Sequence, residues 1–452
     1  MIAHLAAALA VVATVAACGD NLPGSDDGFS PTSGTRLSLQ KYRYADGTEV
    51  AVSSEFYDTQ LHTRCAAQTW PDGALLCVPV ADDVQYSDAA CTTAVGIGRT
   101  IQQPTFFVAR DPEPGGTPIR VFKAGGTAPS ITQYYSRTGG ACTGPTAVPP
   151  GVNRLYALGN ELDATDLVGF HDTELGADTD RLALALRETD DGLRVATGLR
   201  DRELGAACTP SPQADGSTAC APAGAATPTY FLDAACTLPV VATAAGAATP
   251  TLARIAAASG CATYHRISRE IQPPVYQLDS RATCALVAAP DGGRLFAVET
   301  AVELPALDRS LEPAAGRRLQ RVVLGHGDLR FFDARLFDTQ ASADCLPRTQ
   351  RDQTFCLPAD LVAATTAFSA GCTDMVRVAE VPQHACTPVG FATTQRPFQL
   401  RALGDVATGM FQLRSDGCRP YTGAPGNELR SLGPPLDLTA FESAIYYGER
   451  SP

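Results

Sequence analysis

The sequence lacks most of the residues by which nucleic-acid-binding proteins are recognised. Among its 452 residues there is one tryptophan, lysine occurs only at Lys41 and Lys123, and the formal net charge is −13. Phosphate backbones attract basic side chains, and single-stranded bases stack on aromatic rings. An acidic chain with few aromatic residues therefore argues against binding to nucleic acid or to an anionic lipid surface.

Motifs for catalysis, phosphate binding and metal binding are also missing. The chain has no Gly-x-Ser-x-Gly elbow, no His-Glu-x-x-His pair and no Gly-x4-Gly-Lys loop. It has no Cys-x2-Cys spacing for zinc. The acidic run 188–192 is only a weak calcium candidate, because it lacks the alternating aspartates of a calcium loop. We therefore expect no cofactor and no metal, and the sequence gives no motif that would indicate an enzyme.

Histidines give no catalytic signal either. The five that follow the N-terminal apolar run stand at different places relative to the repeat described below: His62, His171, His265, His326 and His384. Without an acidic or nucleophilic partner at a fixed spacing, we interpret each as a surface or structural residue.

Only the N-terminus indicates a membrane-directed segment, since no later stretch has eighteen uninterrupted apolar residues. The apolar run from Ile2 to Ala17 ends in Ala16-Ala17-Cys18, which resembles the site where bacterial lipoproteins are cut before an acylated cysteine. We expect a signal peptide at 1–17, lipidation of Cys18 and a flexible Gly/Pro/Ser/Asp-rich tether at 18–34. The alternatives are an ordinary signal peptide that is cut nearby and a buried apolar strand.

Fourteen cysteines remain after Cys18, and an even number in an exported chain favours disulfides. Six of them belong to a pattern that is written three times. An aspartate stands seven residues before a cysteine, and a Cys-x-Pro triplet follows. The aspartates are Asp58, Asp201 and Asp338, and the cysteine pairs are Cys65 and Cys77, Cys208 and Cys220, and Cys345 and Cys356.

A repeat of this length predicts the architecture. The copies span about 35–178, 179–316 and 317–452 of one domain at 35–452, and each opens with an Arg-Leu pair followed by strand-like runs and short turns. We expect two four-stranded blocks in each copy. Six blocks predict an all-β, six-bladed propeller. Three separate β-domains in a row are the alternative, although the joints between the copies are short.

Each copy also ends in the same way. An acid (Asp163, Glu303 or Asp437) is followed four residues later by an apolar side chain. This spacing predicts the start of a short helical turn.

The repeat also limits the disulfide pairing. A turn lies midway between the two cysteines of each early pair, which predicts Cys65–Cys77, Cys208–Cys220 and Cys345–Cys356 as hairpin disulfides. We further predict Cys261–Cys284 and Cys372–Cys386. Cys91 and Cys142 are left in the first copy and can join each other. Cys236 and Cys418 either pair across blades or remain free thiols.

Residues that recur in every copy are most simply framework, because a catalytic site is normally needed once. We therefore interpret Asp58, Asp201 and Asp338 as acids that accept backbone N–H groups in the turn before each hairpin.

The chain resembles uncharacterised cysteine-rich repeat lipoproteins of the myxobacterial type. The matching pieces are Ala17-Cys18-Gly19-Asp20-Asn21, the Cys-x-Pro triplets and the Ser-Asp-Ala-Ala-Cys-Thr string at 87–92. The resemblance implies an envelope location, at the outer membrane or cell surface, and a β-rich repeat fold. It implies no activity.

Two functions follow from this interpretation. The first is a lipid-anchored, extracytoplasmic scaffold or binding protein of the bacterial envelope, which presents its surface to an unidentified protein or small ligand. The alternative is an envelope hydrolase or lyase with its site in a central propeller channel, which rests on analogy between folds. Any function is to be sought where the three copies differ.

Overall fold

The computed structural model describes residues 29–448, apart from 100–103, 111–118, 129, 139, 150, 152, 257–260, 273, 279–282, 291, 351, 383–385, 387–388, 396–397 and 424–426. The predicted signal peptide, Cys18 and most of the predicted tether lie outside the described residues. The part that is described is all-β, as expected, with 36 strands and three short 3₁₀ turns. No helix in that part is long and apolar enough to cross a membrane.

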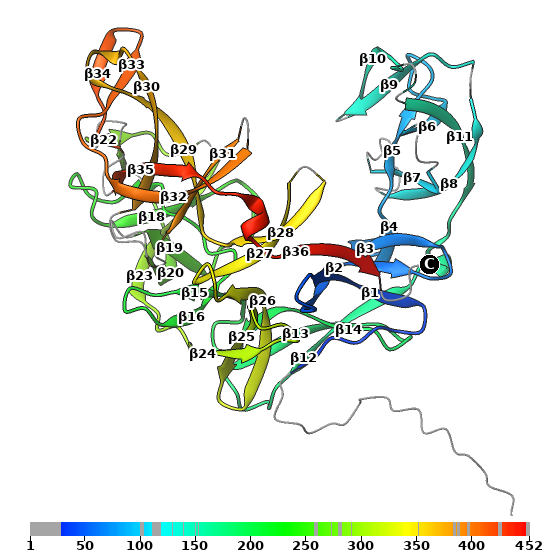
Figure 1. Cartoon of the computed structure of the whole chain (residues 1–452), viewed down its shortest axis with the longest axis horizontal. Coiled ribbons are helices and arrows are strands. Elements are labelled where there is room, and N and C mark those ends of the chain that lie inside the picture. The colour runs from blue at the N-terminus through cyan, green and yellow to red at the C-terminus, as the bar shows by residue number, and fades with distance from the viewer. Residues whose placement is uncertain are drawn as a thin grey trace, which may run out of the picture.

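Fifteen strands form one closed antiparallel sheet, which we call the ring (Figure 1). Five come from each third of the chain, and we call the thirds unit 1 (β1–β12), unit 2 (β13–β24) and unit 3 (β25–β36). In unit 1 they are β1 (Leu37–Tyr44), β2 (Glu49–Asp58), β3 (Thr63–Thr69), β4 (Leu75–Pro79) and β12 (Gly169–Leu175). In unit 2 they are β13 (Leu182–Glu188), β14 (Arg194–Asp201), β15 (Ala206–Pro212), β16 (Thr218–Pro222) and β24 (Ala306–Pro313). In unit 3 they are β25 (Leu319–His326), β26 (Leu329–Asp338), β27 (Ala343–Gln350), β28 (Gln353–Pro358) and β36 (Ser443–Gly448).

The last strand of each unit links it to the next. β12 pairs with β4 of its own unit and with β13 of unit 2, and β24 pairs in the same way with β16 and β25. β36 pairs with β28 and with β1 at the other end of the chain, which closes the ring. Closure leaves the ring without an edge strand, so it offers no unpaired backbone for aggregation.

The seven strands between the fourth and last ring strands of each unit form an outer sheet. In unit 1 they are β5 (Asp82–Tyr86), β6 (Ala94–Arg99), β7 (Phe106–Ala109), β8 (Arg120–Thr127), β9 (Gln133–Thr138), β10 (Ala141–Ala147) and β11 (Asn153–Glu161). In unit 2 they are β17 (Tyr230–Phe231), β18 (Pro239–Thr243), β19 (Leu252–Ala256), β20 (Ala262–Ile271), β21 (Val275–Leu278), β22 (Cys284–Val287) and β23 (Arg294–Ala301). In unit 3 they are β29 (Leu361–Phe368), β30 (Met375–Pro382), β31 (Phe391–Gln395), β32 (Phe398–Val406), β33 (Phe411–Arg414), β34 (Gly417–Pro420) and β35 (Asn427–Pro435).

The three outer sheets share one connectivity. In unit 1 the pairings β5–β6, β6–β11, β11–β8 and β8–β7 are antiparallel, and a parallel pairing of β7 with β5 completes a circuit of five strands. The corresponding parallel contact is β29 with β31 in unit 3, and Ala226 with Ala253 in unit 2. The remaining two strands form a hairpin attached to the first strand of the sheet, β9–β10 in unit 1.

The prediction of six four-stranded blades is not confirmed, because the described strands form one ring and three seven-stranded sheets. The spacing of turns along the chain predicted where the strands lie. It did not show that the fourth strand of each unit pairs with a strand about 90 residues later, as β4 pairs with β12 through Leu76 and Gly169. Those long-range pairings merge what we expected to be three separate blades into one closed sheet.

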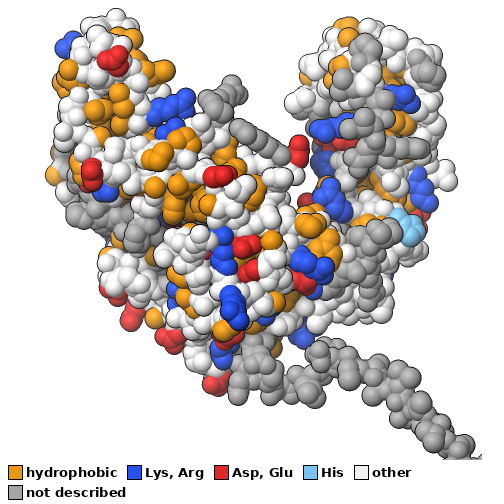
Figure 2. Space-filling view, viewed as in Figure 1, with side chains coloured by type: hydrophobic (Ala, Val, Ile, Leu, Met, Phe, Trp, Pro, Cys, Tyr) orange, Lys and Arg blue, Asp and Glu red, His pale blue; other side chains and the backbone are white. Residues whose placement is uncertain are grey.

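The ring occupies the centre and base of the molecule in Figure 1, and two lobes rise from it. The outer sheet of unit 1 forms one lobe, and the outer sheets of units 2 and 3 lie together in the other. The surface is hollowed between the two lobes (Figure 2).

Apolar side chains of the ring strands form three clusters, and each cluster joins neighbouring units. In the first cluster, Leu37 and Leu39 of unit 1 pack with Leu193 and Val195 of unit 2. In the second, leucines of β13 pack with Leu329 and other residues of unit 3. In the third, Tyr44 of unit 1 packs with Leu319, Leu336, Cys345 and Cys356 of unit 3. Hydrophobic burial thus packs the first two strands of each unit against a neighbouring unit.

A buried ion pair recurs at the start of every unit. Asp58, Asp201 and Asp338 have fully buried side chains, and each accepts hydrogen bonds from Nε and Nη2 of the arginine of an Arg-Leu pair. The Nη2–Oδ2 distances are 2.7 Å from Arg36, 2.9 Å from Arg181 and 2.7 Å from Arg318.

Each pair is also hydrogen-bonded to backbone. The same aspartates accept N–H groups two and three residues further on, as we expected of turn acids. Each arginine donates in addition to a carbonyl near the end of its own unit, at Asp166, Glu303 or Ala440. We call this arrangement the Arg–Asp clamp; it fixes the first ring strand of a unit to the segment before its last one.

A second contact ties the units together through the turns. The Asp191 carboxylate, in the β13–β14 turn of unit 2, accepts the N–H of Leu37 in unit 1 at 2.8 Å. The Asp46 carboxylate, in the β1–β2 turn, accepts the N–H of Leu319 at 3.1 Å. Glycines stand where these carboxylates approach, since a Cβ at Gly34 or Gly316 would collide with them. Gly327 occupies this turn in unit 3.

The structure contains the three hairpin disulfides expected from the sequence, Cys65–Cys77, Cys208–Cys220 and Cys345–Cys356, with Cα–Cα distances of 5.2–5.3 Å. Cys91 joins Cys142, as the sequence left open. The same bridge recurs as Cys236–Cys284 and Cys372–Cys418, and it links the turn before the second strand of each outer sheet to the projecting hairpin.

The predicted pairs Cys261–Cys284 and Cys372–Cys386 are therefore wrong, and Cys236 and Cys418 have partners. Order along the chain suggested neighbours in sequence, whereas the outer hairpin brings a cysteine back from about 50 residues away, as for Cys91 and Cys142. Cys261 and Cys386 join each other instead. Theirs is the one disulfide among the described residues that connects two units.

The predicted helical turns form in two units. η1 (Ala164–Asp166) follows Asp163, and η3 (Leu438–Ala440) follows Asp437, whose side chain accepts the N–H of Thr439 at 3.0 Å. Residues 302–305 of unit 2 contain no such turn, and Pro305 lies within the expected segment. A further turn that we did not predict, η2 (Ala370–Cys372), precedes β30.

We expect Arg181→Met to lower the free energy of unfolding by about 3 kcal/mol, because it leaves the buried Asp201 carboxylate without its charged partner. Chemical denaturation measures the change. Arg419→Met is the matched control, since Arg419 pairs with Asp416 where both side chains are about 60% exposed; its cost is expected to stay below about 1 kcal/mol. Equal effects of the two substitutions would contradict a structural role for the clamp.

We expect the double variant Cys261→Ser/Cys386→Ser to keep the ring intact but to loosen the lobe built by units 2 and 3, because a link across 125 residues is removed. Hydrogen exchange should rise in β19–β20 and β31–β32 and stay unchanged in β1–β4. Cys91→Ser/Cys142→Ser is the control, with its effect confined to unit 1. Faster hydrogen exchange in the ring strands of Cys261→Ser/Cys386→Ser would contradict the prediction that this disulfide stabilises only the lobe.

Candidate functional site

A polar pocket lies where unit 3 closes onto unit 1, on ring strands that run between the two lobes (Figure 1). It holds about 350 Å³. We call it the seam pocket, because β36 and β1 meet there. Its lining comes from β1, β2, β3, β27, β28 and β36: Tyr42, Val52, Ser54, Glu55, Arg64, Thr349, Thr354 and Tyr446.

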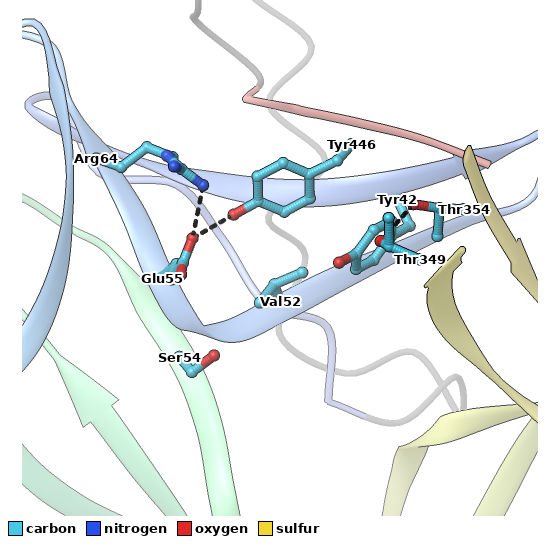
Figure 3. A pocket seen from close by; sticks show the side chains of 8 residues that line it. All are labelled: Tyr42, Val52, Ser54, Glu55, Arg64, Thr349, Thr354 and Tyr446. Atoms are coloured by element: carbon cyan, nitrogen blue, oxygen red, sulfur yellow. Dashed lines mark hydrogen bonds and ion pairs between the residues drawn. The ribbon is translucent and has the colours of Figure 1, made fainter. Parts of the chain in front are cut away.

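Glu55 is the centre of the polar contacts (Figure 3). Its Oε2 accepts a hydrogen bond from the Tyr446 hydroxyl at 2.8 Å and pairs with Arg64 Nη1 at 3.3 Å. The Arg64 guanidinium also lies 6.0 Å from the centre of the Tyr446 ring, within reach of a cation–π attraction. One carboxylate thus connects β2, β3 and the last strand of the chain.

Two tyrosine rings form a wall of the pocket. The rings of Tyr42 and Tyr446 lie 5.0 Å apart, tilted by 49°. Burial raises the pKa of both hydroxyls, and the neighbouring Glu55 charge adds to the effect. Both tyrosines therefore keep their protons at neutral pH and can donate hydrogen bonds.

Hydroxyl groups complete the lining. Thr349 and Thr354 share a hydrogen bond at 2.9 Å across β27 and β28. The hydroxyls of Tyr42 and Ser54 have no hydrogen-bond partner among the residues that the structure describes. These groups are open to a ligand or to water.

The opposite face of β36 carries a second tyrosine–glutamate–arginine set. Tyr447 donates to Glu49 at 2.7 Å, and Arg43 contacts both residues. Because this set repeats the Tyr446 contacts on the other face of the strand, part of the role of both sets is to hold the ring closed.

The three units differ at this place. Counted from the clamp aspartate and the first cysteine, Glu55 and Arg64 correspond to Gly198 and Ala207 in unit 2. In unit 3 the charges are reversed, because Arg335 and Asp344 stand there, 3.7 Å apart. The seam pocket is thus specific to one of the three equivalent sites, which is where we expected a function.

The unit 3 site is occupied by its own ion pairs. Arg335 binds Asp333 through Nε at 2.9 Å, and Arg309 binds Asp344 at 2.6 Å. Burial raises the pKa of the nearby Asp360, and the charge of Asp344 adds to the rise. The arginines bind two of the three carboxylates of this cluster directly, so it is arranged as a salt-bridge network.

A second pocket, of about 340 Å³, lies between the ring and the outer sheet of unit 2. Alanine, valine and leucine side chains form about half of its lining, and Asp215 is its one charged residue. It offers fewer polar groups for ligand binding than the seam pocket does.

The residues singled out from the sequence do not meet in either pocket. The clamp aspartates are buried under their arginines, and the bridged cysteines lie in the hydrophobic clusters or the outer sheets. His171 pairs with Glu188 at 3.8 Å on the surface, while His265 and His326 contact backbone carbonyls. His384 lies outside the described residues.

Sequence reasoning missed the pocket residues and the arginine of each clamp. An Arg-Leu pair stands 20 or 22 residues before each aspartate, and that recurrence could have identified the clamp. Nothing in the local sequence connects Tyr446 to Glu55, because 391 residues separate them.

No group of three or more His, Cys, Asp or Glu side chains in the described ranges could hold a metal ion. A family model described as a family of unknown function (DUF7481) matches residues 11–441. The chain belongs to this family. No curated protein and no solved structure matches the chain.

We expect Tyr446→Phe to lower the free energy of unfolding by about 2 kcal/mol, since it removes a hydrogen bond to a charged carboxylate at the ring closure. Tyr57→Phe is the control, because the Tyr57 hydroxyl has no hydrogen-bond partner in the described part of the chain. Thermal and chemical unfolding measure both variants. An equal loss in the control would show that the Tyr446 contact contributes little to closure.

Proposed function

We propose that this protein is a lipid-anchored, extracytoplasmic binding protein of the bacterial envelope, with the seam pocket as its ligand site. The observation that carries the proposal is the pocket itself: a polar, solvent-accessible site built from three distant parts of the chain. The pocket also lies where the three units differ, since Glu55 and Arg64 correspond to Gly198 and Ala207 in unit 2 and to Arg335 and Asp344 in unit 3.

The compartment is supported by the disulfides. Seven cysteine pairs indicate an oxidising, extracytoplasmic environment. The Ala16-Ala17-Cys18 sequence and the resemblance to repeat lipoproteins support anchoring through a lipid on Cys18. The tether that follows would hold the ring and its lobes away from the membrane.

Binding is better supported than catalysis. The hydrolase or lyase alternative requires a site in the central channel of a propeller, whereas the seam pocket lies where the strands of units 3 and 1 meet. Glu55, the carboxylate of the seam pocket, is already bound by Arg64 and Tyr446. Its Oε2 is thus already occupied by protein partners, whereas the free hydroxyls beside it suit recognition.

Two neighbouring serines give a matched test. Ser54 lines the pocket, and Ser53 is equally exposed but does not line it. We expect Ser54→Trp to fill the pocket and Ser53→Trp to leave it open. The full-length protein in detergent would be screened by thermal shift against a mixed library of sugars, amino acids, peptides and nucleosides.

The expected result is at least one compound that stabilises the wild type and Ser53→Trp but not Ser54→Trp. If every stabilising compound acts equally on both variants, the seam pocket is not the ligand site. If Ser54→Trp alone is unfolded, Ser54→Leu, which adds less bulk, replaces it in the same comparison.

A further inference from the structure

We propose that the seam pocket binds a neutral oligosaccharide. This inference rests on the proposed function and adds the chemical class of the ligand. Three properties of the pocket support it: its charge balance, its hydroxyl groups and its aromatic wall.

The charges of the pocket cancel. Glu55 and Arg64 are its only charged lining residues, and they pair with each other at 3.3 Å. An anionic ligand would have to compete with Glu55 for Arg64, and a cationic ligand would have to compete with Arg64 for Glu55. Either exchange removes an existing ion pair, so a neutral ligand is favoured.

The remaining polar groups are hydroxyls. Tyr42, Ser54, Thr349 and Thr354 each carry one, and Tyr446 carries another that is bonded to Glu55. A hydroxyl both donates and accepts a hydrogen bond, and so matches the hydroxyls of a sugar without fixing their orientation. Peptides and nucleobases present fixed donor and acceptor patterns, which backbone or amide groups recognise better.

The tyrosines supply the apolar surface. A sugar ring has a face of C–H groups that packs on aromatic rings, and the tilted pair of Tyr42 and Tyr446 offers such a wall. The volume of about 350 Å³ is near the lower end of small-molecule sites. Ser54 and Thr349 are exposed, so a longer chain can leave the pocket along the surface.

Binding would be measured by isothermal titration calorimetry on the full-length protein in detergent. The neutral probes are cellohexaose, maltohexaose and hexa-N-acetylchitohexaose; the charged probes are hexagalacturonate and fully deacetylated chitohexaose. We expect at least one neutral probe to bind, with an affinity about tenfold lower in Ser54→Trp and unchanged in Ser53→Trp. The charged probes should bind at least about tenfold more weakly.

Glu55→Gln tests the charge argument separately. It leaves Arg64 unpaired and makes the pocket positive, so hexagalacturonate should gain affinity by about tenfold or more while deacetylated chitohexaose does not. Circular dichroism would establish that this variant is folded. Should it fail to fold, Arg64→Met, which leaves the pocket negative, makes the opposite prediction for the two charged probes.

The inference and the proposed function can fail separately. If the wild type prefers a charged sugar, or if none of the neutral probes binds, the inference is wrong. A peptide or nucleoside whose binding is lost only in Ser54→Trp would overturn the inference but support the ligand site. If no compound of any class is lost in Ser54→Trp, both fail.

Discussion

The pairing of β36 with β1 is the contact on which the whole molecule depends. It joins the two ends of a described chain of about 420 residues and turns an open run of hairpins into a closed ring. Without it, β1 and β36 would each expose an edge of unpaired backbone groups. Closure also creates the seam pocket, because Tyr446 reaches Glu55 only when the last strand lies against the first unit. Stability of the ring and formation of the candidate site thus share one interaction.

Three other kinds of contact stabilise the fold. Apolar clusters pack each unit against its neighbours, and the Arg–Asp clamps fix the start of each unit to its own closing segment. The disulfides act mostly within single hairpins and outer sheets. Cys261–Cys386 is the exception, since it joins the outer sheets of units 2 and 3 into one lobe. The molecule therefore has three-fold repetition in its ring but two lobes above it (Figure 1).

The recurring framework residues and the candidate site lie at different places in the molecule. The clamp aspartates and the hairpin cysteines recur in all three units, because every unit has to close onto the next. At the Glu55 and Arg64 positions the units no longer agree: one has glycine and alanine, and one has the charges reversed. A side chain that the ring does not require in all three copies is free to serve recognition in one of them.

Sequence alone determined the properties that depend on local pattern. Strand-like runs and short turns predicted the strands, and the turn midway between Cys65 and Cys77 predicted the hairpin disulfide. The spacing of Asp58 before Cys65 gave the turn acid. Tertiary structure decided what depends on contacts between distant segments: the ring instead of six blades, the partners of Cys236, Cys261, Cys386 and Cys418, and the seam pocket. A local pattern reports which way a strand's side chains face, but not which strand lies beside it. That choice is made by the packing of all three units at once.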